Sequence, residues 1–378
     1  MKPRSAFLLI ITLALIGALS ACTADGGSIY ATIETEQKIN VSTLSQTITV
    51  LDLVNTFSTP FRYLVAAGAV YKGRVPNTDN EIGWPTPKKD PVAVSPPAKG
   101  ALCLALTKFG SDFYGAFFTS DGSTMGLYKS VGAPGYSFAV APIADPLVAG
   151  KQICLLQVAN NTLFAVVATS DGTSGFTFEL VYSTDGSSFT ATNLTNVKDL
   201  ITGVGFFAGN YYITAGSTLY SDSGAGLNSL APITAFSIDS GDELRGITVD
   251  DVAGYILIPS SNGDVYWSTN GTAWPKAGTS DEINGHQVAF LTVSTRVGVP
   301  ASGDVFLVGA DGAGYYTLNT GNGDLSRFSD VTVTGLYAGA VRRILVDGST
   351  VFMGAAGTGL WRATFDPAGE VNSTWIHE

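Results

Sequence analysis

Seven copies of a short apolar pattern run through the chain and constrain its fold more than any other feature. Each copy is an apolar or aromatic pair that ends in an aromatic residue and is followed by a small, hydroxyl or basic residue. The copies end at residues 73, 130, 183, 221, 268, 317 and 363, so consecutive copies lie 38 to 57 residues apart. Repeats of this length are typical of four-stranded propeller blades, which need about 40–50 residues each. The copies are Val70–Gly73, Leu127–Ser130, Val181–Ser183, Leu219–Ser221, Val265–Ser268, Tyr315–Thr317 and Leu360–Ala363.

The residues around each copy predict strands and tight turns. Apolar runs alternate with clusters of Gly, Asn, Asp and Ser, as in Ile256–Pro259 followed by Ser260–Gly263. No helical periodicity of convincing length is present. A length of 378 residues suggests two or three domains, but seven repeats predict one all-β domain. We expect a single β-propeller of seven four-stranded blades over residues 29–378.

Two segments of this predicted ring need a separate interpretation. The chain ends soon after Trp375, leaving little length for an outermost strand in the last blade. We therefore expect the N-terminal segment Ile29–Lys38 to pair with that blade and close the ring, because an unpaired edge is a liability. Deletion of residues 29–40 should then lower the melting temperature by many degrees. The proline-rich insertion Pro76–Pro97 is expected to form an exposed arm of the first blade.

Composition excludes two broad classes of protein. Aromatic residues make up 11% of the chain and charged residues 13%, which argues against intrinsic disorder. The chain carries 20 Lys and Arg against 31 Asp and Glu, a net charge of −11. Nucleic-acid binding needs a basic surface, so nucleic acid is not an expected partner.

The first residues have the pattern of a secretory leader. Lys2 and Arg4 precede an uncharged run from Ala6 to Ala21, too short for a permanent membrane span of about twenty residues. The junction Leu19-Ser20-Ala21-Cys22 resembles the lipobox of bacterial lipoproteins. That resemblance implies a leader over 1–21, a lipid on Cys22 and a tether over 22–28. An ordinary leader or a membrane anchor is the alternative.

Removal of residues 1–21 would leave 18 basic and 31 acidic residues, a net charge of −13. Such a charge does not favour flat contact with anionic headgroups, so membrane attachment would depend on the acyl chains. Loss of palmitate labelling in Cys22→Ala protein would test this expectation.

Two of the repeats continue into a motif known from other propellers. Ser183-Thr184-Asp185-Gly186-Ser187-Ser188-Phe189 and Ser268-Thr269-Asn270-Gly271-Thr272-Ala273-Trp274 resemble the Asp-boxes of sialidase-type propellers. The resemblance covers these two sites and is degenerate at Ser221–Gly224. It implies structural roles: Asp or Asn binds backbone N–H groups, Gly adopts a positive φ, and the aromatic residue returns to the core. The implied structural residues are Ser183, Asp185, Gly186, Phe189, Ser268, Asn270, Gly271 and Trp274.

No catalytic, cofactor or metal site is predicted from the remaining residues. Cys103 and Cys154 occupy the same register of neighbouring repeats and are interpreted as inner-strand residues, either free or oxidised in an exported protein. His286 and His377 are isolated, and no nucleophile elbow is present. The oxygen-rich loops Asn77–Glu81 and Asn319–Asp324 are of a kind that calcium favours, but they lack EF-hand spacing and are interpreted as turns.

A sialidase is the sharpest enzymatic hypothesis, and the sequence departs from it. Phe61-Arg62-Tyr63-Leu64 keeps the aromatic residue and Arg of that family's motif but lacks the following Ile and Pro. Arg362 follows Trp361 at a repeat position and is interpreted as a strand residue. Paired carboxylates of another glycosidase stay open, because they need only meet in space.

Three pairs of adjacent aromatic residues offer another possible sugar site. Adjacent strand residues point to opposite faces, so one member of each pair should be buried and the other should pack between blades. Stacking on sugar rings is the alternative. The pairs are Phe117-Phe118, Phe206-Phe207 and Tyr211-Tyr212.

The sequence as a whole favours a non-catalytic, lipid-anchored propeller of the bacterial cell envelope, on the periplasmic or surface-exposed side. Propeller faces present loops on a rigid ring and suit protein docking. Similar Asp-box propellers occur in sortilin-type receptors and photosystem assembly factors, which bind polypeptides. A protein-binding or assembly scaffold is therefore the first hypothesis. A carbohydrate-binding or glycosidase propeller is the second, since fold alone does not decide function.

Overall fold

A computed structural model describes thirteen segments of the chain: residues 50–53, 61–74, 92–131, 137–173, 175–251, 254–276, 305–310, 314–319, 327–330, 341–347, 350–355, 359–364 and 376–377. The chain separates into two compact units, Met1–Ser42 and Thr43–Glu378, and every described residue lies in the second. All regular elements among these residues are β-strands, as predicted. In these segments no helix is long and apolar enough to cross a membrane.

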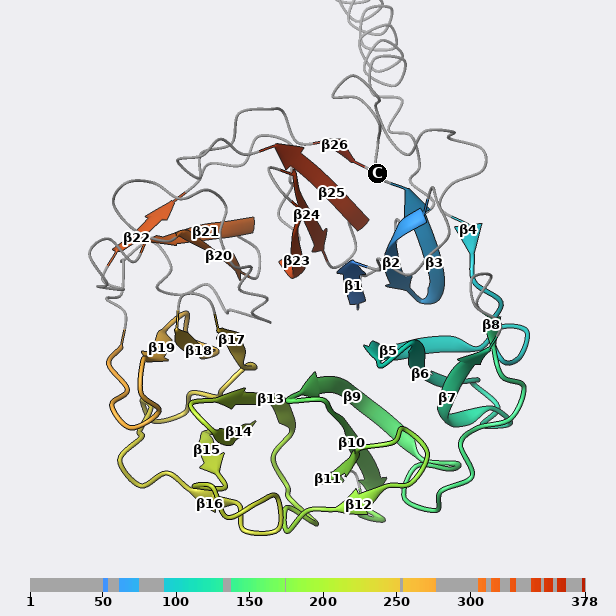
Figure 1. Cartoon of the computed structure of the whole chain (residues 1–378), viewed down its shortest axis with the longest axis horizontal. Helices are drawn as coiled ribbons and strands as arrows, with labels where there is room; N and C mark the ends of the chain where they lie inside the picture. Colours follow the sequence, from blue (N-terminus) through green and yellow to red (C-terminus); the bar gives the residue numbers. More distant parts are fainter. Residues whose placement is uncertain are drawn as a thin grey trace, which may run out of the picture. The chain divides into compact units, whose positions relative to one another are not determined.

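The strands form seven antiparallel sheets, which we number as blades 1 to 7 in chain order (Figure 1). Blade 1 contains β1–β4 (Val50–Leu53, Phe61–Ala67, Ala69–Arg74, Val92–Ala93), and blade 2 contains β5–β8 (Leu102–Phe109, Asp112–Phe118, Met125–Val131, Ser137–Phe138). Blade 3 contains β9–β12 (Gln152–Ala159, Thr162–Ser170, Phe176–Ser183, Thr190–Ala191), and blade 4 contains β13–β16 (Ile201–Phe207, Asn210–Ala215, Thr218–Ser221, Ala231–Pro232).

The remaining three blades complete the order. Blade 5 contains β17–β19 (Thr248–Asp250, Tyr255–Pro259, Val265–Ser268), and blade 6 contains β20–β22 (Val305–Ala310, Gly314–Asn319, Arg327–Asp330). Blade 7 contains β23–β26 (Val341–Asp347, Thr350–Ala355, Gly359–Thr364, Ile376–His377). Innermost strands contact each other between blades 1 and 2, 2 and 3, 3 and 4, 4 and 5, 6 and 7, and 7 and 1, and Figure 1 shows the seven sheets around a ring.

Not every blade has the four strands that the repeat length predicts. In the described residues five sheets have four strands and two have three. Blade 5 ends in an isolated bridge between Tyr266 and Lys276 instead of a fourth strand. In blade 6 the repeat motif Tyr315–Thr317 lies on β21, and residues 277–304, which precede β20, are outside the described segments. Among the described residues, the expectation of four strands in every blade is therefore corrected to three strands in blades 5 and 6.

The outer edge of blade 7 differs from the expectation as well. β26 is the fourth strand of this blade, with Ile376 opposite Arg362 and His377 opposite Trp361. Two residues after Trp375 are sufficient, because the outermost strands of most blades are equally short. The C-terminus thus occupies the edge that was assigned to the N-terminal strand. Residues 29–40 themselves lie outside the described segments.

The end of the Pro76–Pro97 insertion is part of blade 1 rather than an exposed arm. Val92 and Ala93 form β4 and pair with Lys72 and Tyr71 of β3. Val94 is buried and donates its backbone N–H to the carbonyl of Val70. Pairing with β3 explains the difference, because every blade needs a partner for its third strand. Residues 75–91 are not among the described ones.

The innermost strands of four blades share one irregularity. A β-bulge interrupts the pairing of the first two strands at Leu104 in blade 2, Cys154 in blade 3, Thr202 in blade 4 and Arg342 in blade 7. A bulge increases the local twist of a strand and turns its side chains. The recurrence of the bulge confirms that these strands are equivalent repeats.

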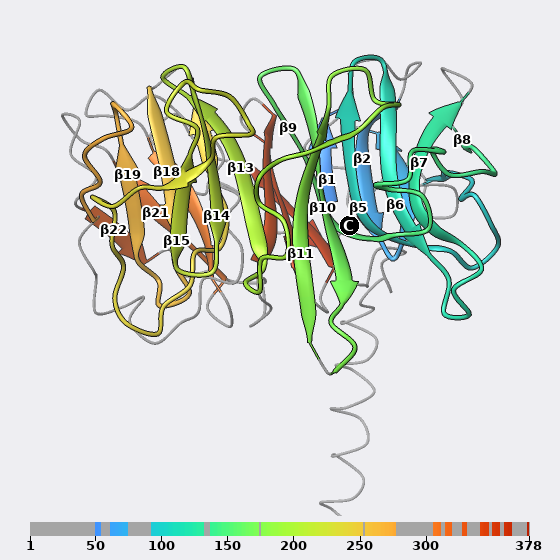
Figure 2. The same cartoon turned by 90° about the horizontal axis from the view of Figure 1, so that it is seen from below.

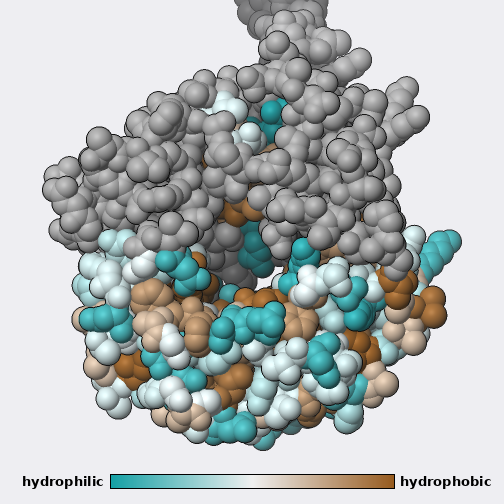
Figure 3. Space-filling model, in the orientation of Figure 1, coloured by the Kyte–Doolittle hydropathy of each residue, from teal (hydrophilic) through white to brown (hydrophobic). Residues whose placement is uncertain are grey.

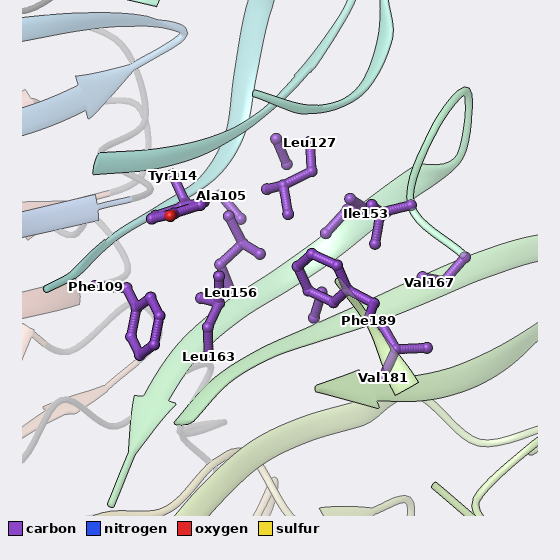
Figure 4. Packing of buried hydrophobic residues seen from close by; sticks show 13 residues of the cluster. Ala105, Phe109, Tyr114, Leu127, Ile153, Leu156, Leu163, Val167, Val181 and Phe189 are labelled. Carbon is purple, nitrogen blue, oxygen red and sulfur yellow. The ribbon is translucent and has the colours of Figure 1, made fainter. Parts of the chain in front are cut away.

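The hydrophobic core is divided among the interfaces between blades. One cluster joins blades 2 and 3 and contains Tyr114, Leu127, Leu156, Leu163 and Val181 (Figure 4). Similar clusters lie between blades 1 and 2, 3 and 4, and 4 and 5. In the blades that lie between two of these clusters, both faces of the middle strands are apolar, because each face packs against a neighbouring blade. This explains the continuous burial of Thr162–Ala168 in β10.

The ring has two ends, which carry different turns. We call the end where innermost strands begin the entry face; it also carries the turns between second and third strands. The opposite end, the hairpin face, carries the turns between first and second strands and the Ser183–Phe189 turn. Seen from the side, the hairpin of β10 and β11 extends further at the entry face than the neighbouring strands (Figure 2). Figure 3 shows an opening at the centre of the ring, bordered in its described part by hydrophilic and hydrophobic residues.

Candidate functional site

The predicted structural turn of blade 3 is held by a compact set of hydrogen bonds. The Gly186 N–H donates to Ser183 Oγ (2.8 Å), and the Ser183 hydroxyl donates to Asp185 Oδ1 (2.9 Å). The same Oδ1 accepts the N–H groups of Ser187 (2.7 Å) and Ser188 (2.8 Å). These donors hold the pKa of Asp185 below its usual range, the Ser188 N–H contributing most. The ionised carboxylate of Asp185 thus stabilises the turn.

The turn of blade 5 has the same arrangement with Asn in place of Asp. The Gly271 N–H donates to Ser268 Oγ (2.8 Å), and Asn270 Oδ1 accepts the N–H groups of Thr272 (2.9 Å) and Ala273 (3.0 Å). Trp274 then returns to the core, 5.7 Å from the Tyr212 ring. An amide oxygen can replace the carboxylate because the turn uses a single acceptor atom.

Each of these turns packs against a tyrosine of the preceding blade, a partner that sequence reasoning missed. Gly186 has φ +74°, and a Cβ there would overlap the hydroxyl of Tyr114 on β6. Gly271 also has φ +74°, and a Cβ there would overlap the hydroxyl of Tyr212 on β14. Tyr114 and Tyr212 are each the third residue of the second strand in their blade. A tyrosine at this shared position is the sequence feature that marks the contact, but it can be recognised only when the blades are aligned with each other.

The degenerate turn of blade 4 is built differently. Asp222 is 4% exposed, and its Oδ1 accepts the N–H groups of Tyr211 (3.0 Å) and Gly224 (3.2 Å). Its carboxylate thus binds the second strand of its own blade. In blade 3 the position equivalent to Tyr114 and Tyr212 is Phe164, which has no hydroxyl to meet the next turn.

The cysteines and arginines singled out by sequence do not meet in a site. Cys103 and Cys154 are free thiols on inner strands of blades 2 and 3, as interpreted. Burial raises the pKa of Cys154 to about 11 and raises that of Cys103 as well. Arg62 lies on β2, and Arg362 is a buried strand residue on β25.

One member of each aromatic pair is buried, as expected. Phe117, Phe207 and Tyr212 are buried, while Phe118, Phe206 and Tyr211 are half-buried. Phe206 and Tyr211 pack between blades 3 and 4 with ring centroids 4.9 Å apart. The amide of Asn160 donates to the Tyr211 hydroxyl (3.3 Å), and the Thr162 hydroxyl lies 3.3 Å from it. The pair thus combines a partly exposed aromatic surface with polar groups at the hairpin face.

A polar network around the buried Asp242 holds the β18–β19 turn of blade 5 to the segment that precedes β17, and it was not predicted. Asp242 Oδ1 accepts the Ser261 hydroxyl (2.5 Å) and the N–H groups of Asn262 (3.0 Å) and Glu243 (2.9 Å). Nearby, Lys276 Nζ bridges Asp264 (2.5 Å) and Asp239 (3.1 Å).

The phenol of Tyr266 lies beside Asp264 of this network. Burial and the neighbouring Asp264 raise the pKa of the Tyr266 hydroxyl to about 12, which keeps it neutral. No group of three potential metal ligands is found in the described segments.

Three large apolar side chains are exposed at the entry face of blades 2 to 4. Leu102 begins β5, Phe176 begins β11 and Leu200 precedes β13; their side chains are 44%, 48% and 40% exposed. The turns beside them carry exposed carboxylates. Asp121 Oδ1 accepts the Thr119 hydroxyl (2.6 Å) and the Ser123 N–H (3.0 Å), which lower the pKa of Asp121 to about 2. Asp171 is held in the same way by Thr173 and Gly175.

Several residues named from the sequence lie outside the described segments. They are the lipidation candidate Cys22, the candidate calcium loop Asn77–Glu81, most of the loop Asn319–Asp324, and His286. The lipid anchor therefore stays a prediction.

Comparison with known proteins shows a fold and no family. No protein-family model matches the chain, and no curated protein matches it. Among solved structures, it is similar to YCF48 bound to D1 peptide, with 12% identity and a TM-score of 0.54, over 86% of this chain and 94% of that one.

Two further solved structures are similar. The extracellular domain of the hybrid two-component system BT4673 from B. thetaiotaomicron has 9% identity and a TM-score of 0.52, over 83% of this chain and 38% of that one. The computationally designed Ika8 protein has 13% identity and a TM-score of 0.48, over 84% and 83% of the two chains. At these identities the first two likenesses support the fold alone, and with the ring of sheets they establish that this chain is a β-propeller.

Proposed function

We propose that this chain is a lipid-anchored protein of a bacterial cell envelope whose propeller of seven blades binds another protein. The observation that carries the proposal is the closed ring, which holds turns from neighbouring blades on two rigid faces. A rigid array of turns loses little entropy when a partner docks. A propeller similar in fold has been solved with a bound peptide, which supports polypeptide binding as a use of this architecture.

The location of the protein rests on its first residues. Leu19-Ser20-Ala21-Cys22 supplies the lipobox, and the preceding Lys2, Arg4 and apolar run supply the leader. Lipid on Cys22 would hold the propeller at a membrane through the tether 22–28. Palmitate labelling of the wild type, lost in Cys22→Ala, is the expected result. Labelling retained in the variant would overturn the anchor.

We assign the turns Ser183–Phe189 and Ser268–Trp274 as Asp-boxes with structural roles. Their Asp and Asn side chains accept hydrogen bonds from backbone N–H groups, and their glycines pack against Tyr114 and Tyr212. These turns therefore stabilise the blades that carry them.

Cross-linking in native cells tests the proposed binding function. Tagged lipidated protein is cross-linked and its captured proteins are identified, with Cys22→Ala as the soluble control. A reproducible envelope protein that is captured only by the anchored form is the expected result. Capture of no protein by folded, anchored bait would overturn the scaffold function.

Carbohydrate binding is the second candidate, and one observation favours it. Phe206 and Tyr211 are half-buried at the hairpin face beside the amide of Asn160 and the hydroxyl of Thr162. An aromatic ring with adjacent amide and hydroxyl groups suits a sugar. Glycan-array binding that is lost in Tyr211→Ala and kept in Tyr182→Phe would support this candidate. Absence of binding to any glycan would remove it.

A further inference from the structure

Exposed apolar side chains gather at one end of the ring. Five large hydrophobic residues are exposed in the described segments, and three of them, Leu102, Phe176 and Leu200, lie at the entry face. The other two, Val131 and Val140, lie at the end of β7 and beyond β8. Phe176 begins β11, in the hairpin that extends beyond the neighbouring strands at this face (Figure 2).

The charges beside these residues balance, although the chain as a whole is acidic. In blades 2 to 4 the entry face carries exposed Lys99, Lys151 and Lys198 next to the starts of the inner strands. It also carries exposed Asp121, Asp171 and Asp199. Three positive and three negative charges leave this patch neutral, against a net charge of −11 for the chain. The acid excess that repels a membrane surface is therefore absent here.

The chain joins the ring at the same end. β1 begins at Val50, opposite Ala66, and β2 reaches its turn at Gly68 two residues later. The Gly68 carbonyl accepts the N–H of Cys103, the second residue of β5, so β1 begins at the entry face. Cys22 lies 28 residues before Val50, a span of roughly 95 Å when fully extended. A segment of this length between Cys22 and β1 lets the ring lie against a bilayer, and the apolar residues decide which face does so.

We propose that the entry face rests on the lipid bilayer, with Leu102, Phe176 and Leu200 at the boundary between headgroups and acyl chains. Aromatic and aliphatic side chains flanked by lysines are the residues that suit this boundary. The inference rests on the lipid anchor of the proposed function. It leaves the hairpin face directed away from the membrane and free for a partner. Because the patch is neutral, the contact depends little on the fraction of anionic lipid.

Tryptophan probes in the full lipidated chain test this orientation. The variants Phe176→Trp and Leu200→Trp place a probe in the patch, and Val140→Trp places a matched one at a residue that is 89% exposed elsewhere. Each protein is reconstituted with vesicles of phosphatidylcholine or of its brominated form, and wild-type emission is subtracted. Bromine should quench the two entry-face probes at least twofold more than the Val140→Trp probe. Adding anionic phosphatidylglycerol should not change that ratio.

Flotation of each protein with the vesicles separates the two possible failures. A wild-type chain that does not float would overturn the anchor, and this orientation with it. Flotation with equal quenching of all three probes would overturn the orientation and leave the anchor standing. Entry-face probes shielded from aqueous iodide but unquenched by bromine would mean that a protein or a second copy covers the patch, which also overturns the proposal.

Discussion

Gly186 and Gly271 occupy positions that only glycine can fill, for two reasons. Both have a φ of +74°, where a side chain is strained, and both face a tyrosine hydroxyl that leaves no space for a Cβ. The turn is therefore coupled to the preceding blade, and its glycine serves the ring as well as the local backbone. At the entry face, Gly172 also has a positive φ of +78°, but the space around it is open.

This contrast gives a matched pair of substitutions. Gly172→Ala should lower the free energy of unfolding by about 1 kcal/mol, the usual cost of left-handed backbone strain. Gly186→Ala should cost about 1–3 kcal/mol more, because the methyl group also overpacks against Tyr114. Urea titrations measure both. Tyr114→Phe should recover part of the loss in a double-mutant cycle, and equal costs for the two glycines would contradict the coupling.

The ionised carboxylate of Asp121 predicts a pH dependence. Its pKa is lowered from 3.8 to about 2 by bonds that favour the charged form, so its stabilisation is complete above the unfolded pKa. That contribution is lost as the pH falls from 3.8 toward about 2. The difference in urea midpoint between wild type and Asp121→Asn should thus shrink over this range. A difference that is constant between pH 6 and about 3 would show that the charge contributes nothing.

At the scale of elements, short outer strands and tight hairpins complete each blade. β26 has two residues, yet it covers the edge of β25 in the last blade. The hairpin of β13 and β14 turns through Ala208, which has φ +49°, and Gly209, which has φ +85°. Two positive φ angles in succession match the twist of paired strands, and Gly or Asn usually occupies both positions. Blade 3 has Asn160 and Asn161 at the equivalent turn, with φ +46° and +52°.

Removal of the last three residues tests the role of β26. A chain ending at Trp375 should melt a few degrees lower than the full chain, because β25 loses its edge partner. Deletion of Glu378 alone is the control and should leave the melting temperature unchanged. Equal melting temperatures for both truncated chains would show that β26 contributes nothing to closure.

The strained alanine of the β13–β14 hairpin offers a stabilising substitution. Ala208→Gly relieves a positive φ and should raise the free energy of unfolding by up to about 1 kcal/mol. Ala231→Gly, at an exposed strand position with ordinary φ, should lower it by about 0.5–1 kcal/mol. Thermal melts of both variants measure the two changes. A loss of stability in Ala208→Gly would contradict the strain.

At the scale of the whole molecule, packing between blades replaces a central core. The described clusters lie between successive blades, and β1 and β23 bring the first and seventh blades together. Repeats that contact only their neighbours unfold by nearest-neighbour coupling, and a closed ring has no terminal repeat from which unfolding can begin.

Closure of the ring therefore predicts cooperative unfolding. Far-UV circular dichroism reports all blades, whereas the emission of the five tryptophans, which include Trp267 in blade 5 and Trp361 in blade 7, reports only a few sites. Urea midpoints from the two signals should coincide in the full chain and separate in the chain that ends at Trp375. Midpoints that already differ in the full chain would show that the blades unfold independently.

Much of the fold was predictable because it rests on local patterns. The seven copies of the apolar motif, including Val181–Ser183 and Val265–Ser268, lie on strands, and the turns after these two copies have the hydrogen bonds that Ser, Asp, Asn and Gly predict. Alternation within a strand also predicted that one member of each aromatic pair is buried, as Phe207 is beside the half-buried Phe206. These features depend on neighbours in the sequence.

What only the tertiary structure decided involves residues far apart in the chain. Nothing local to Tyr114 indicates that Gly186 lies under its hydroxyl, or that the C-terminal β26 rather than an N-terminal strand covers β25. The gathering of Leu102, Phe176 and Leu200 at one face likewise depends on where blades 2, 3 and 4 stand in the ring. The sequence by itself determined the strands, the turns and the repeat, because backbone geometry and alternation are local. Closure and the shared face came from the ring, because they depend on contacts between blades.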